Sequence, residues 1–154
     1  MSHSRKTLWR QKQWNERKAN GLCVYCGNRK DGKQLACDKC RARKNEVLRK
    51  SNLNLKLQAF DAYGGRICSC KNCPERANPN VTFLTLNHIG GGGTKHRKEI
   101  GGSRNTGGGV SLAGIETYRW LRKRGYPKGF NVLCWNCQWG IHINKGVCPH
   151  EKQQ

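Results

Sequence analysis

The sequence predicts a small α+β protein stabilised by metal-bound cysteines, and three observations support this fold class. Only 35% of the 154 residues are apolar, below the usual fraction for a globular domain, which limits the hydrophobic core. Ten cysteines are present, most of them in C-x2-C pairs that are typical of zinc sites. Helical and strand-like apolar patterns both occur along the chain. A core this small needs cross-links, which the cysteines can supply through metal ions.

The first half of the chain predicts two helices. Residues 5–20 are helix-compatible and highly charged. Residues 38–63 contain neither glycine nor proline, and Leu53, Leu57 and Phe60 recur at the spacing of one helix face. We therefore expect a short basic helix and then a long one.

Four cysteines lie between these helices, in two C-x2-C pairs separated by ten residues: Cys23, Cys26, Cys37 and Cys40. Two such pairs can turn their sulfurs inward to complete a tetrahedron of thiolates, which is the ligand set that structural Zn²⁺ prefers. Four protein ligands leave no open position on the ion. The pattern therefore predicts a structural zinc site rather than a catalytic one.

The second half alternates strand and helix signals. Residues 81–87 predict a strand, and residues 89–111 hold nine of the 19 glycines and predict a long functional or disordered loop. Ser111 can cap a helix over residues 112–124, whose arginines and lysines face outward. The stretch FNVLCWNC, residues 130–137, predicts a short strand leading into a cysteine knuckle, and a final short helix is expected after it.

A second zinc site is expected from two further C-x2-C pairs: Cys70 with Cys73, and Cys134 with Cys137. Closing this site would bring together the ends of the segment between the pairs. Cys68 is left over. Cys148 and His150 stay open, either as alternative metal ligands or, for Cys148, as a small buried apolar residue, which is the favoured interpretation.

The chain is strongly basic, with 30 lysines and arginines against nine acidic residues and a net charge of +21. We expect a polyanionic partner, nucleic acid first, because neutralised phosphates release condensed counterions. Neither a long apolar run nor a signal-peptide core is present, so no membrane partner is expected. This favours a cytoplasmic, reducing location, where paired cysteines are more often metal ligands than disulfides.

One stretch, FLTLNHIGGGGTKHR (residues 83–97), places His88 at the end of a strand and before a glycine-rich basic loop. Together with YRWLRKRGYPKGFNVLCWNCQWGIH (residues 118–142) and the flanking cysteine pairs, it resembles the HNH endonucleases of the His-Me finger, or ββα-metal, superfamily, especially phage-type members. The resemblance covers about residues 60–150. The upstream four-cysteine module resembles the small zinc ribbons or knuckles often attached to such nucleases.

The resemblance implies three domains: a basic helix with the zinc module (residues 1–45), a linking helix (46–63) and a zinc-stabilised ββα-metal nuclease domain (64–154). It also implies a metal-dependent endonuclease that nicks or cuts double-stranded DNA. Besides structural Zn²⁺ at two sites, it implies a catalytic divalent ion such as Mg²⁺, Mn²⁺ or Ni²⁺. Whether the chain acts as a monomer or a homodimer stays open.

The resemblance assigns roles to single residues. His88 would be the general base, and Asn131 would orient it. Asn87 and Gln138 would bind the catalytic metal ion, with His142 as a competing ligand. Asn87 stands where the family usually has aspartate, and Gln138 where it usually has asparagine or histidine.

Ten basic side chains are expected to hold DNA phosphates: Arg41, Arg43, Lys44, Lys95, His96, Arg97, Arg119, Arg122, Lys123 and Arg124. Two alternative functions stay open. One is a structure-selective nuclease similar to recombination endonuclease VII, which would favour a dimer on branched DNA. The other is a non-catalytic zinc protein that binds DNA or RNA. Homing, phage packaging and defence all remain open as biological roles.

Overall fold

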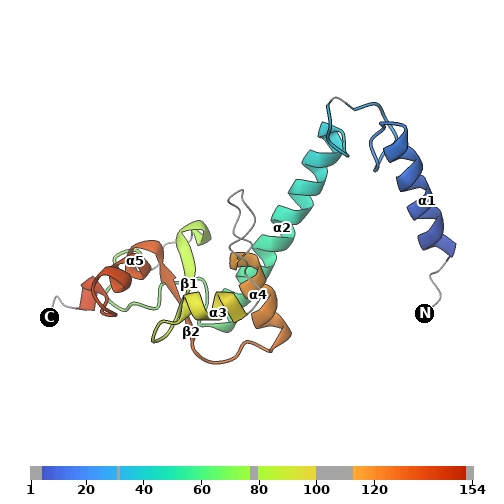
Figure 1. Cartoon of the computed structure of the whole chain (residues 1–154). Helices are drawn as coiled ribbons and strands as arrows, with labels where there is room; N and C mark the ends of the chain where they lie inside the picture. The colour runs from blue at the N-terminus through green and yellow to red at the C-terminus, as the bar shows by residue number, and fades with distance from the viewer. Residues whose placement is uncertain (1–4, 31, 77–79, 100–112, 152–154) are drawn as a thin grey trace. The chain divides into compact units, whose positions relative to one another are not determined.

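The computed structural model describes residues 5–30, 32–76, 80–99 and 113–151. Its elements in chain order are α1 (Arg5–Ala19), α2 (Asp38–Ala62), the 3-10 helix η1 (Val81–Phe83), β1 (Leu84–His88), α3 (Gly93–Glu99), α4 (Ala113–Lys123), β2 (Phe130–Cys134), α5 (Trp135–Ile143) and the 3-10 helix η2 (Pro149–Glu151) (Figure 1). The predicted mixed α+β class is confirmed. Among the described residues, no helix has the length and apolar character needed to span a membrane.

The chain divides into two compact units, Met1–Ser51 and Asn52–Gln154, and the division lies inside α2. The first unit holds α1, the four-cysteine loop and the start of α2. The second unit holds the end of α2 and all later elements. The predicted domains were residues 1–45, 46–63 and 64–154, and in the structure α2 runs across the division between the two units.

Helix α1 ends in a glycine-dependent turn. Gly21 has a φ of 66°, a left-handed conformation that glycine adopts without steric cost. The N–H of Leu22 donates to the carbonyl oxygen of Arg17 at 2.9 Å, which satisfies one of the last carbonyls of the helix. Arg17 then donates to the carbonyl oxygen of Tyr25 at 2.8 Å. This contact holds the cysteine-bearing loop against α1.

The C-terminal half of α2 buries a face that differs from the predicted one. Leu55, Ala59 and Phe60 are buried, whereas Leu53 is 44% exposed. Positions i, i+4 and i+5 therefore face the core, which rotates the buried stripe relative to the expected i, i+4, i+7 pattern. Phe60 at the end of this stripe packs edge-on against Tyr118 of α4, with ring centroids 6.4 Å apart.

Strands β1 and β2 form a two-stranded antiparallel sheet, in which Leu84 pairs with Cys134 and His88 with Phe130 at the two ends of the register. Helix α5 follows β2 directly, and Cys134 is its N-cap, with a sulfur that accepts from the N–H of Cys137. The two strands and α5 therefore form a ββα unit in which α3 and α4 lie between the strands in sequence.

Two predicted segments differ locally. The expected strand over residues 81–87 begins as η1, where the side chain of Asn80 accepts from the N–H of Thr82, and β1 extends one residue further, to His88. The expected loop over residues 89–111 contains α3 instead. The predicted Ser111 cap lies outside the described residues.

The core of the second unit is built largely from sulfur. Six of the ten buried residues in its main cluster are cysteines, and the others are Phe60, Leu84, Val132 and Leu133. So few aliphatic side chains bury little apolar area, which limits the hydrophobic contribution to stability. A metal ion bound by these cysteines would therefore add strongly to the stability of this unit.

Gly140 in α5 gives a test of this packing. A Cβ at this position would lie 2.5 Å from Cδ of Pro149, closer than any real contact. We expect Gly140→Ala to lower the free energy of unfolding by about 1–3 kcal/mol through overpacking. The matched control is Gly114→Ala in α4, where a Cβ would have no neighbour within 4 Å.

Urea unfolding followed by circular dichroism measures both variants. Gly114→Ala should leave stability unchanged or raise it by up to about 1 kcal/mol, because alanine is the better helix former. Equal effects of the two substitutions would contradict the close packing of α5 against Pro149.

Candidate functional site

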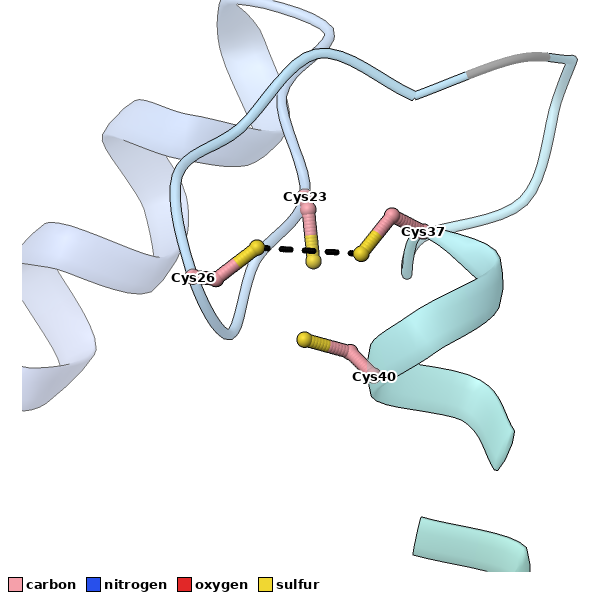
Figure 2. Close-up of side chains that lie close together, drawn as sticks. All are labelled: Cys23, Cys26, Cys37 and Cys40. Carbon is pink, nitrogen blue, oxygen red and sulfur yellow. Dashed lines mark hydrogen bonds between the residues drawn. The ribbon is translucent and has the colours of Figure 1, made fainter. Parts of the chain in front are cut away.

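The first cysteine site brings together the four side chains predicted from the sequence. Cys23 and Cys26 come from the loop after α1, while Cys37 and Cys40 flank the first turn of α2, and all four point toward one another (Figure 2). Their sulfurs lie within 4.8 Å of one another, and those of Cys26 and Cys37 are 3.7 Å apart. Two thiolates on a tetrahedral Zn²⁺ are about 3.8 Å apart when each Zn–S bond is about 2.3 Å. The group could therefore hold a structural metal ion.

Titration of these thiols also suits a metal site. Burial opposes ionisation of Cys23, but backbone N–H groups of Cys26, Cys37 and Tyr25 outweigh it and lower the pKa of Cys23 to about 6. Side-chain contacts with Cys26 and Cys37 raise the pKa of Cys40 to about 12. Without a metal ion, ionisation of one thiol thus makes ionisation of its neighbours unfavourable, and a bound cation would remove that repulsion between thiolates.

The second site forms with a different ligand set from the predicted one. The sulfurs of Cys68, Cys73, Cys134 and Cys137 lie within 4.8 Å of one another, and all four residues are buried. Cys68 takes the position that the sequence assigned to Cys70. Its sulfur accepts from the backbone N–H of Cys134 at 3.3 Å, at the end of β2. The C-x2-C spacing favoured Cys70, but the path of the chain against β2 brings Cys68 to the knuckle.

Cys70 belongs to a third group that the sequence did not assemble. Its members, all within 4.8 Å of one another, are Cys70, Cys137, Cys148 and His150. The sulfur of Cys148 lies 3.6 Å from that of Cys70, so Cys148 is not merely the small apolar residue that the sequence favoured. The C-x-H spacing at the end of the chain was the available signal for this group. The three groups could hold structural metal ions, and their donor atoms suit zinc.

Burial shapes the titration of the second group. Burial and the side chain of Cys134 raise the pKa of Cys73 to about 12. Burial also opposes ionisation of Cys134, but the backbone N–H of Cys137 and neighbouring side chains prevail, and the pKa of Cys134 is lowered. Burial and the surrounding cysteines raise the pKa of Cys137. This buried sulfur cluster is therefore poorly suited to carry several thiolates without cations.

Next to the knuckle, three amide side chains meet. Asn87 donates from Nδ2 to Oδ1 of Asn131 at 2.9 Å, and Gln138 donates from Nε2 to Oδ1 of Asn87 at 3.1 Å. Asn87 and Asn131 are register partners in β1 and β2, and Gln138 lies one residue after Cys137 in α5. The buried Oε1 of Gln138 finds no hydrogen-bond partner among the residues that the structure describes. Such an orphaned buried acceptor is costly unless a ligand or cation satisfies it.

His88 lies beside a second histidine. Its Nε2 is 2.8 Å from Nδ1 of His96 in α3, and its ring is 4.7 Å from that of its register partner Phe130. His96 is only 9% exposed, and its ring also lies 4.4 Å from that of Trp120 in α4. Its Nε2 is buried without a hydrogen-bond partner in the described part of the chain. His88 is thus held by the rings of His96 from α3 and Phe130 from β2, and Trp120 of α4 packs against His96 in turn.

Two expected site residues make contacts that the sequence did not predict. The side chain of Asn131 hydrogen-bonds to Asn87, its register partner. The ring of His88 contacts that of His96. His96 was expected to bind phosphate, but its buried ring cannot serve as a surface contact for DNA.

The remaining expected ligand, His142, is exposed on α5, and its ring lies 5.6 Å from that of Trp139. The structure does not bring it into the amide group of Asn87, Asn131 and Gln138 through any described contact. Gln138 is therefore the better supported of the two positions expected after the knuckle.

The expected phosphate-binding residues mostly lie on helix surfaces. In the first unit, Arg41 pairs with Asp38 at 2.8 Å, Lys44 lies over the ring of Tyr25, and Arg43 is exposed. In the second unit, Arg122 and Lys123 are exposed on α4, Arg119 pairs with Glu116, and Arg124 lies 4.7 Å from the ring of Trp120. Lys95 is exposed on α3, which also contains Arg97.

Comparison with protein-family models, with curated proteins and with solved structures found no match for this chain.

If the four cysteines of the first site hold one zinc ion, replacing any one of them should remove that ion. Cys26→Ser should weaken zinc binding there by at least about 100-fold, because losing a ligand exceeds the 10–100-fold effect of changing an outer neighbour of a ligand. Elemental analysis after dialysis should find one zinc fewer per chain than in the parent. Ser51→Ala, a change outside all three groups, is the control and should keep the parent's zinc content.

The same preparations separate this site from the others. The second unit should keep its fold in Cys26→Ser, as measured by unchanged amide hydrogen exchange at the residues of β1 and β2. An unchanged zinc content in Cys26→Ser would contradict the site.

Proposed function

We propose that this chain is a metal-dependent endonuclease of the HNH type, which hydrolyses phosphodiester bonds in DNA. The observation that carries the proposal is the ββα unit beside the cysteine cluster. It places His88 at the end of β1 and, next to it in sequence, an amide group of Asn87, Asn131 and Gln138 drawn from β1, β2 and α5. The candidate base His88 and one candidate metal ligand, Asn87, are adjacent residues of β1, and the second candidate ligand, Gln138, comes from α5.

The amide group fits a hard divalent cation in one respect. Adjacent oxygen ligands of an octahedral Mg²⁺ lie about 3 Å apart when each bond is about 2.1 Å. Oδ1 of Asn87 lies 3.1 Å from the amide nitrogen of Gln138, and the oxygen and nitrogen of an amide exchange places when the group turns over. Once Gln138 turns over, its Oε1, which has no hydrogen-bond partner among the described residues in the observed orientation, would be the second oxygen ligand beside Oδ1 of Asn87. A divalent ion held by Asn87 and Gln138 would supply charge stabilisation at the scissile phosphate.

His88 would take the proton from the attacking water. A general base must be positioned as well as basic, and His96 supplies the position through the 2.8 Å contact between the two rings. Because both contacting atoms are imidazole nitrogens, a proton that His88 gains can be shared with His96. A Cβ on Gly93 would lie 3.2 Å from Nδ1 of His88, so glycine at this point keeps side-chain atoms away from the ring.

A row of rings connects His88 to positive charge. The ring of His96 lies between those of His88 and Trp120. The guanidinium group of Arg124 lies over the ring of Trp120. The exposed Arg122 and Lys123 belong to the same helix, α4. Phosphates bound along α4 would therefore approach the histidine pair. Such contacts position nucleic acid without reading its sequence.

A second candidate is a zinc-stabilised protein that binds DNA or RNA without cutting it. The amide group favours it, because Asn87, Asn131 and Gln138 bring no negative charge and already hydrogen-bond to one another. Sites for Mg²⁺ in proteins usually include one or two carboxylates. In a nuclease of this kind, the phosphate of the substrate has to supply the missing charge.

Plasmid cleavage separates the two candidates. The purified chain is incubated with supercoiled plasmid and Mg²⁺, Mn²⁺ or Ni²⁺. We expect nicked or linear product from the parent and a rate about 10²–10⁴-fold lower in His88→Ala, the usual cost of losing a general base. Thr85→Ala, three residues earlier on β1, is the matched control and should cleave at the parent's rate.

Binding is measured on the same preparations by gel shift. Retained binding with no cleavage by the parent under any of the three ions would establish the non-catalytic candidate. Equal cleavage by the parent and His88→Ala would remove His88 from the chemistry and with it the proposed mechanism.

A further inference from the structure

Seven ligand residues of the second unit form two groups of four, because one residue belongs to both. The first group is Cys68, Cys73, Cys134 and Cys137, and the second is Cys70, Cys137, Cys148 and His150. We propose that these residues bind two metal ions, most naturally zinc, that share the thiolate of Cys137. The cluster would bind structural metal only and does not depend on the proposed nuclease activity.

The distances fit two adjoining tetrahedra. The sulfurs of Cys73 and Cys134 lie 3.6 Å apart in the first group, and those of Cys70 and Cys148 lie 3.6 Å apart in the second. Both values are close to the roughly 3.8 Å expected between two thiolates on one tetrahedral zinc ion. The 3.7 Å between Cys26 and Cys37 in the first unit is of the same size.

The surroundings of His150 argue against simple hydrogen bonding. Its Nδ1 lies 3.4 Å from the sulfur of Cys137, 3.6 Å from that of Cys148 and 4.0 Å from that of Cys70. One ring nitrogen carries either one proton or one lone pair, so it can form one good hydrogen bond. Three sulfurs around a single nitrogen are better explained by a cation to which all four atoms bind. Zn–N bonds of about 2.0 Å and Zn–S bonds of about 2.3 Å place nitrogen and sulfur about 3.5 Å apart in a tetrahedron.

Ligand counting requires the shared sulfur. Two tetrahedral ions need eight ligand positions, and the seven residues fill eight only when Cys137 is counted twice. A thiolate has more than one lone pair and can bind two cations at once. Six thiolates and two zinc ions carry a net charge of −2, with His150 neutral. This is far less charge than six thiolates without cations would place in a cluster whose cysteines are all at most 5% exposed.

The chain holds the C-terminal ligands in place independently of any ion. Pro149, between Cys148 and His150, packs against Gly140 so closely that a Cβ on Gly140 would overlap it. The side chain of Asn72 donates to the carbonyl oxygen of His150 at 3.2 Å. The second ion would therefore fasten η2 and the loop around Cys70 to α5. Since Gln138 follows the shared ligand Cys137, the cluster also fixes one side of the amide group.

Two measurements on the whole chain test the proposal. Native mass spectrometry of protein purified with zinc should find three ions per chain, one in the first unit and two in the second. After exchange to ¹¹³Cd, nuclear magnetic resonance should show three cadmium signals. Two of these should be split by coupling to each other through the Cys137 sulfur, and the third should be unsplit. Neither measurement requires a variant to fold.

Variants then assign the second ion. Cys148→Ser and His150→Ala should each bind two zinc ions per chain, while His142→Ala, an exposed histidine on the same helix as Cys137, should keep three. Two zinc ions in the parent, or three zinc ions with no cadmium–cadmium coupling, would overturn the shared thiolate. An unchanged count of three in His150→Ala would overturn the assignment of the second group.

Discussion

The constraint on which this structure depends is the gathering of buried cysteines, in groups that could hold metal ions, in place of a large hydrophobic core. In the second unit, six of the ten residues in the main buried cluster are cysteines. Burial and contacts with neighbouring cysteines raise the pKa of several of these thiols, so cations are needed before they can all act as thiolates. Metal binding at these groups would then be coupled to folding. Cys134 ends β2 and Cys137 lies in the first turn of α5, so a metal ion bound by both would fix the position of the helix against the sheet.

The features that could be predicted from the sequence were those encoded by residues close together in the chain. The four-cysteine site of the first unit is encoded by two C-x2-C pairs and a short spacer, so spacing alone identified Cys23, Cys26, Cys37 and Cys40. Helices α1 and α2 were also predictable, since their long stretches without glycine or proline leave few alternatives. The ligands of the second unit were not, because the segment C-x-C-x2-C offers two ways to choose a pair. Which cysteine faces β2 depends on contacts between residues more than 60 positions apart, such as Cys134 with Cys68.

The sequence identified residues of the candidate active site but did not predict which of their side chains contact one another. The sequence located His88, Asn87, Asn131 and Gln138, but it could not tell which side chains share a face of the sheet. Antiparallel register decides that, and it pairs Asn131 with Asn87 while His88 faces Phe130. His96 was expected to bind phosphate from the basic loop that follows His88. The helix α3, which a glycine-rich stretch concealed, turns it inward against His88 instead.

Bound metal ions would hold β1 and β2 in register beneath the candidate site. Amide hydrogen exchange at the strand residues, including Asn87 and Asn131, tests this in zinc-bound protein and after chelation under reducing conditions. We expect slow exchange with zinc and loss of that protection without it, because the remaining apolar core is too small to hold the sheet alone. Strand amides that stay equally protected after complete removal of the metal would show that the sheet does not need the ions.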